Sequence, residues 1–232
     1  MAFSLAADAQ EITIDLGDEG QNGTFSGRII QMVALLTVLS LAPSILIMMT
    51  SFTRIVVVLS FLRTAIGIQQ TPPNTVMISL ALFLTFFIMA PTFQAAYTQG
   101  VAPLVAEEID EMEAFERTVN PFKEFMLSHV REQDLRLFME MSKTEEPEDK
   151  MDVPLQVLIP AFMISELRRA FEIGFMLFLP FLIIDMVTAS ILMSMGMMML
   201  PPVTISLPFK IMFFVLVDGW YLITGSLVQS FG

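Results

Sequence analysis

Nine charged side chains interrupt the apolar stretches of this 232-residue sequence, and their chemistry is tightly constrained. A charge that faces lipid costs several kcal/mol, so each must pair with an opposite charge or line water. Two kinds of chemistry could follow: structural ion pairs, or a relay that moves protons or other ions. The nine residues are Arg54, Arg63, Glu166, Arg168, Arg169, Glu172, Asp185, Lys210 and Asp218.

The segment SELRRAFE holds four of these charges on one predicted helix. Residues three or four positions apart are neighbours on a helix surface. Glu166 and Arg169 have the first spacing, and Arg168 and Glu172 have the second. The segment can therefore neutralise much of its own charge.

Asp185 and Lys210 lie on either side of Gly196, 11 residues before it and 14 residues after it. If a helical hairpin turns at Gly196, these spacings bring the two side chains to similar depths. Structural pairing, within or between subunits, is favoured over a proton or ion relay because the acids are balanced by bases.

Signatures of enzyme chemistry are missing from the sequence. It contains no Gly-x4-Gly-Lys-[Ser/Thr] phosphate loop and no HExxH motif, and it has no cysteine and one histidine, His129. We expect His129 to be a surface residue. The sequence predicts no enzyme activity, no metal site and no cofactor.

Methionine supplies five of the seven residues in MSMGMMM, next to a double proline. Most methionines in an apolar helix fill the core. Met197, Met198 and Met199, however, are consecutive and follow Gly196, so they cannot all face one packing surface. Because methionine is flexible and soft, a ring of such turns from several subunits would make a deformable seal.

The composition is that of a membrane protein, with 55% hydrophobic and 16% charged residues and a mean hydropathy of +0.70. The formal charge of -12 arises mainly from residues 107–152, which hold 15 of the 24 acids. This balance disfavours nucleic acid as a partner. The first basic residue is Arg28, so the N-terminus lacks the layout of a secretory signal, which we expect to be absent or removed.

Charge-free runs predict four membrane spans by hydropathy alone, because about 20 apolar residues cross a bilayer. The run over residues 64–106 is too long for one span and must turn. TPPN supplies that turn, with Asn74 as the expected helix N-cap.

Two turns with the same pattern divide the apolar sequence into two helical hairpins. GIQQTPPNTV begins at Gly67 and GMMMLPPVTI at Gly196, and both fit Gly-x4-Pro-Pro-x-Thr-[Val/Ile], through duplication or by chance. Glycine allows a left-handed helix end, and proline prevents the helix from continuing. We expect an all-α fold in which both turns lie at one end and the acidic segment at the other.

The arms that precede these turns, residues 29–66 and 155–195, are too long for simple spans. As helices they would run on the order of 55 to 60 Å. We expect severe tilt, protrusion from the bilayer, or kinks at Pro43, Pro160 and Pro180. Basic residues such as Arg54 and Arg63 near the first turn would place the turns on the cytoplasmic side.

The acidic segment contains apolar residues near helical spacing, which predicts an amphipathic helix around residues 121–141. Two alternatives remain for its aromatic face. Phe125 and Phe138 could pack on the chain's own hairpins, or they could bind a neighbouring copy. Residues 143–152 are expected to form a solvated loop.

Three long stretches resemble the FliP family, the flagellar branch of the type III secretion export-gate proteins (FliP/SctR). They are SLAPSILIMMTSFTRIVVVLSFLRTAIGIQQTPPN, IPAFMISELRRAFEIGF and MGMMMLPPVTISLPFKIMFFVLVDGW. The similarity covers nearly the whole chain from Arg28. Flagellar members usually carry a cleaved signal sequence, and this chain departs from that pattern.

The resemblance implies a pentamer that assembles with the small FliQ and a single FliR into a conical pore for unfolded flagellar proteins. The hairpins would lie largely above the membrane plane, in the basal body, on the periplasmic side of the bacterial inner membrane. The methionine constriction of the family maps to Met197, Met198 and Met199. Its intersubunit charge contacts map to Glu166 and Lys210, with Asp185 nearby.

The expected organisation has four parts: a polar extension (residues 1–27), a first hairpin (28–106), an acidic extracytoplasmic segment (107–152) and a second hairpin (153–232). The expected function is that of an export-gate subunit with a methionine seal against ion leakage. Two alternatives remain: an ion- or proton-coupled transporter that uses the embedded charges, and a structural nucleus for basal-body assembly without gating.

Overall fold

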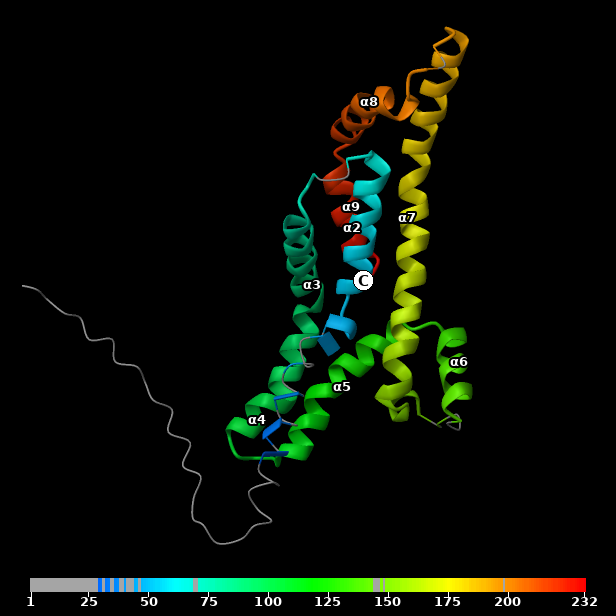
Figure 1. Ribbon diagram of the computed structural model, residues 1–232. Helices are drawn as coiled ribbons and strands as arrows, with labels where there is room; N and C mark the ends of the chain where they lie inside the picture. The colour runs from blue at the N-terminus through cyan, green and yellow to red at the C-terminus, as the bar shows by residue number, and fades with distance from the viewer. Residues whose placement is uncertain are drawn as a thin grey trace, which may run out of the picture. The chain divides into compact units, whose positions relative to one another are not determined.

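The computed structural model describes residues 47–68, 71–143, 147, 149–197 and 199–232, together with some of residues 29–45. The chain divides into two compact units, Met1–Ala42 and Pro43–Gly232. Within the described residues all regular structure is helical, so the fold is all-α as expected. The helices discussed below belong to the second unit (Figure 1).

The first hairpin consists of α2 (Phe52–Ile66) and α3 (Asn74–Ala96). Gly67 ends α2 with φ of +92°, and its N–H bonds to the carbonyl oxygen of Arg63 at 3.3 Å. This is the left-handed helix end that favours glycine. Asn74 is not the N-cap that we expected, because Pro73 takes that position and the Asn74 side chain accepts a hydrogen bond from Arg63.

The arm before this turn is interrupted at residues 49–51, directly before α2 begins. Thr50 accounts for the interruption. Its hydroxyl donates to the carbonyl oxygen of Ile47 at 2.9 Å and accepts the N–H of Phe52 at 3.4 Å, so it competes with the helical backbone. Pro43, where a kink was predicted, lies outside the described residues.

The acidic segment forms two helices, α5 (Glu111–His129) and α6 (Glu132–Ser142), where one helix was predicted. A π-helical turn (Tyr97–Val101) and the short α4 (Ala102–Val105) connect α3 to them. The break falls at Val130 and Arg131, which are extended. The Arg131 N–H donates to the Ser165 hydroxyl at 3.0 Å, so a tertiary hydrogen bond replaces a helical one.

The second hairpin begins with α7 (Leu155–Ser194), which follows a 3₁₀ turn (Lys150–Asp152) and continues through both of its prolines. The chain turns at Gly196 and continues into α8 (Pro202–Leu216) and α9 (Gly219–Gln229), which meet at 63°. Gly196 has φ of +76°. The Met197 N–H bonds to the Leu192 carbonyl and the Gly196 N–H to the Met193 carbonyl, which is a Schellman motif.

Two apolar clusters hold the helices together. One joins α2, α3, α7, α8 and α9 around residues such as Ile55 and Leu59, and the other joins α3, α5, α6 and α7 around Met126 and Phe162. Within this unit, both hairpin turns lie toward one end, and α4, α5 and α6 lie toward the other, as the sequence predicted (Figure 1).

Hydropathy alone predicts four spans, and the first of them, residues 29–53, lies partly outside the described residues. The segments Asn74–Val105 and Leu155–Ser194 are long and apolar enough to cross a membrane. The α8 and α9 pair reaches that standard only when both helices are counted together across their bend.

Candidate functional site

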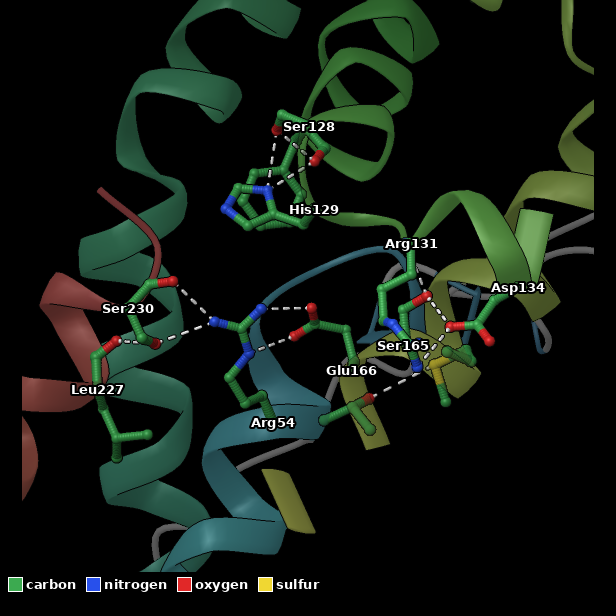
Figure 2. A network of polar contacts seen from close by, with 12 residues as sticks. Arg54, Ser128, His129, Arg131, Asp134, Ser165, Glu166, Leu227 and Ser230 are labelled. Carbon is green, nitrogen blue, oxygen red and sulfur yellow. Dashed lines mark hydrogen bonds and ion pairs between the residues drawn. The ribbon is translucent and has the colours of Figure 1, made fainter. Parts of the chain in front are cut away.

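Arg54 and Glu166 form a buried ion pair between α2 and α7 (Figure 2). Arg54 Nε lies 2.8 Å from Glu166 Oε2, and Arg54 Nη2 lies 2.5 Å from Oε1. Both side chains are fully buried. Two parallel hydrogen bonds of this kind contribute binding energy and also fix the orientation of the two side chains.

The end of α9 completes the surroundings of Arg54. Arg54 Nη1 donates to the carbonyl and hydroxyl oxygens of Ser230, both at 2.9 Å. The Phe231 ring covers the guanidinium, with 3.6 Å between its centroid and Arg54 Cζ, which adds a cation–π attraction. The buried charge is therefore held by elements from both hairpins.

Ser165, next to Glu166, links this pair to the acidic segment. Its hydroxyl accepts the Arg131 N–H at 3.0 Å and lies 2.7 Å from Asp134 Oδ2, to which it donates (Figure 2). Two consecutive residues of α7 therefore anchor α2 and the α5–α6 junction. Sequence reasoning missed Ser165, and its only signal was a polar residue beside a charge in an apolar helix.

Glu166 does not pair with Arg169, as the i,i+3 spacing suggested, because Arg54 occupies both of its carboxylate oxygens. The i,i+4 partners Arg168 and Glu172 do form an ion pair, at 3.0 Å on an exposed surface. The sequence could identify the local pair, but the partner of Glu166 is far away along the chain.

A second ion pair joins the two arms of the second hairpin. Lys210 Nζ lies 2.6 Å from Asp185 Oδ2, at the matching depth that the sequence suggested. Ser206 donates to the same carboxylate, and Lys210 also donates to the Ala65 carbonyl at 3.2 Å. Because Ala65 lies in the last turn of α2, Lys210 places its positive charge at the negative end of that helix. A contact between Glu166 and Lys210 of different copies stays a prediction.

His129, which we expected at the surface, is only partly exposed. It is half-buried, with its ring centroid 4.6 Å from that of Phe125 and 5.3 Å from that of Phe231, and its Nδ1 lies 2.8 Å from the Phe125 carbonyl oxygen. Phe125 also packs on Phe162, and Phe138 lies against the same apolar cluster. Both phenylalanines therefore contact their own chain, and a contact with a neighbouring copy stays a prediction.

The methionine turn projects away from these contacts. Met197 is 45% exposed and Met199 is 99% exposed, while Met198 lies outside the described residues. A β-carbon on Gly196 would meet no atom within 4 Å. Thioether side chains at this turn are thus available to a surface outside the chain. Across the described residues, no group of three histidine, cysteine, aspartate or glutamate side chains could hold a metal.

Comparison with known sequences identifies the family. The profile of the FliP family matches residues 35–227. The flagellar biosynthetic protein FliP of Caulobacter vibrioides is 61% identical over 230 residues, which cover 99% of this chain and 85% of that protein. That of Bacillus subtilis is 61% identical over 202 residues, or 87% of this chain and 91% of that protein. The chain therefore belongs to the FliP family.

Proposed function

We propose that the protein is a core subunit of the flagellar type III protein export gate. Family membership and relatives named flagellar biosynthetic proteins support a role in flagellar export at a membrane. In this proposal several copies, five by the resemblance, assemble with FliQ, FliR and other export-apparatus membrane proteins. Together they surround an axial channel through which unfolded flagellar proteins leave the cell.

Exposed apolar side chains support assembly with other surfaces. Phe83, Phe87 and Met176 are each more than 60% exposed, as are Leu216 and Tyr221. A chain that is isolated in water would leave all of this area uncovered, which is unfavourable. Lipid, neighbouring copies or other subunits of the gate would cover it.

The exposed methionine turn is the observation that carries the sealing role. Gly196 reverses the chain beyond α7, and Met199 extends almost fully exposed from the turn, while Met197 is about half exposed. Unbranched thioether side chains adapt to varied surfaces. Turns from several copies would close on each other when the channel is idle and deform around a passing polypeptide.

The embedded charges give no specific support to an ion relay. Arg54 is paired with Glu166 and Asp185 with Lys210, so these four groups neutralise one another. A relay needs a group that can change its charge at low cost, and a closely paired group resists that change.

The sealing role is tested by replacing Met197, Met198 and Met199 with alanine. We expect assembled complexes to leak ions and the membrane potential to fall, because alanine cannot span the gap between copies. Met112→Ala with Met141→Ala is the matched control, since both methionines are 70% exposed but lie in the acidic segment. Unchanged ion conductance in complexes shown to be assembled would contradict the proposal.

A further inference from the structure

Six of the nine charges in the apolar helices form ion pairs, and the other three have no ionic partner among the described residues. Arg63, Arg169 and Asp218 form no ion pair with any residue that the structure describes. Arg169 lies close enough to Arg54 for the two positive charges to act on each other, so it belongs to the surroundings of the Arg54–Glu166 pair. Arg63 and Asp218 remain as one base and one acid without a counter-charge in the part of the chain that the structure describes.

Asp218 lies at the 63° bend between α8 and α9, in the left-handed conformation with φ of 50°. Its carboxylate caps no N–H of α9 and is exposed. The neighbouring Val215 and Leu216 are 70% and 78% exposed, so this carboxylate is surrounded by apolar surface. When that surface is covered, the carboxylate loses water and needs a cation nearby.

Arg63 is the available cation on the first hairpin. It lies in the last turn of α2, and its guanidinium donates to the Asn74 side chain but has no carboxylate partner among the described residues. One neutral acceptor satisfies only part of a group with five N–H donors. Arg63 can therefore bind a carboxylate without breaking an existing ion pair.

The two side chains lie at nearly the same level along α7. The ring of Phe61, two residues before Arg63, packs on Phe171 and Phe178. The residues on either side of Asp218 line a pocket with α7 residues 176, 177, 180 and 181. The α7 residues beside Phe61 and those beside Asp218 are centred about one helical turn apart. At 1.5 Å per residue this is a difference of about 5 Å along the helix.

We propose that Arg63 of one copy binds Asp218 of the neighbouring copy. This inference rests on the proposed function, because it requires several copies side by side. Contact between two different patches of the same chain is a head-to-tail interface, which can close into a ring. The pair would hold the bend between α8 and α9 of one copy against α2 of the next copy.

Cysteine crosslinking tests the contact directly because the chain has no cysteine of its own. Two differently tagged chains, one with Arg63→Cys and one with Asp218→Cys, are expressed together and oxidised in the purified assembly. We expect a disulfide-linked dimer that carries both tags. Arg63→Cys with the distant Met112→Cys is the control and should give none.

Charge exchange is the second test. Asp218→Arg should lower the yield of rings several-fold in native gels and mass photometry, and adding Arg63→Asp should restore most of it. Rings that form without the mixed dimer, or no restoration by the double variant, would overturn the inference and leave the proposed function standing. If the unaltered chain with its gate partners forms no ring at all, both fail.

Discussion

Arg54 and Glu166 are both buried away from water. Other contacts must therefore replace the hydrogen bonds that water would make to the two charged groups. Glu166 receives two bonds from Arg54, while Arg54 also donates to Ser230 and lies under the Phe231 ring. The desolvation of two charges is large, so such a pair adds little net stability compared with apolar side chains. Losing one partner is different, because the other charge stays buried alone.

We expect Glu166→Gln to lower the free energy of unfolding by about 3 to 5 kcal/mol, because it leaves Arg54 uncompensated. Unfolding of the purified protein in detergent, followed by circular dichroism during titration with denaturant, measures this. Glu172→Gln is the control: its partner Arg168 is exposed, and such pairs contribute about 1 kcal/mol or less. Equal effects of the two substitutions would argue against a buried pair.

Helices α2 and α7 approach closely because Gly174 has no side chain. A β-carbon at Gly174 would overlap the ring of Phe61, which lies edge-on between Phe171 and Phe178. The Phe61 ring fills the space that the side chain of a larger residue at position 174 would need. The contact sets the spacing of the two helices that also carry the Arg54–Glu166 pair.

We expect Gly174→Ala to cost about 1 to 3 kcal/mol of stability through overpacking, and Phe61→Leu to recover part of that loss in the double variant. Gly225→Ala is the matched control. It lies inside α9 with no atom near its β-carbon position, so the substitution should be neutral or stabilising. The same unfolding titration measures all four variants, and a Gly174→Ala protein as stable as the control would contradict close packing.

The sequence could predict elements whose causes are local. Gly67 and Gly196 end helices in the left-handed conformation that glycine allows, and both turns were placed correctly. It could not predict the break at Arg131, since that break depends on a hydrogen bond to Ser165, 34 residues away. Asn74 was misassigned for the same reason: its side chain binds Arg63 across the turn.

The two hairpins and the acidic segment meet at the end of α9. Phe231 stacks on Phe125 of α5, touches His129 and covers Arg54 of α2. Three segments that are far apart in the sequence thus share one aromatic ring. No local sequence pattern predicts such a junction. The sequence could therefore identify individual residues of this site but not that they contact one another.

Replacing Phe231 should loosen this junction as a whole. We expect Phe231→Ala to cost about 2 kcal/mol, because it removes a cation–π contact and two ring contacts. Hydrogen exchange should increase in both α5 and α9, which separates a shared junction from a local defect. Phe231→Tyr keeps the ring and should retain most of the stability. Faster exchange in α9 alone would show that α5 does not depend on this ring.

Lys210 has two candidate partners, one in its own chain and one in a neighbouring copy. Within the chain it binds Asp185 and caps α2 through Ala65. In the assembly that the family resemblance implies, it would bind Glu166 of another copy. The intrachain alternative leaves Glu166 with Arg54, whereas the intersubunit alternative would require Glu166 to serve two cations.

Exchange of charges decides between these partners. Lys210→Asp should reduce ring assembly strongly, because it leaves two acids facing each other in a site that is 4% exposed at Lys210. We expect the double variant Lys210→Asp with Asp185→Lys to restore assembly only in part. A lysine on α7 re-forms the ion pair but does not reproduce the bond to the Ala65 carbonyl. Lys210→Glu with Glu166→Lys should not restore it, because the new lysine would lie beside Arg54. Restoration by that second pair alone, measured by the yield of rings in native gels, would instead place the contact between copies.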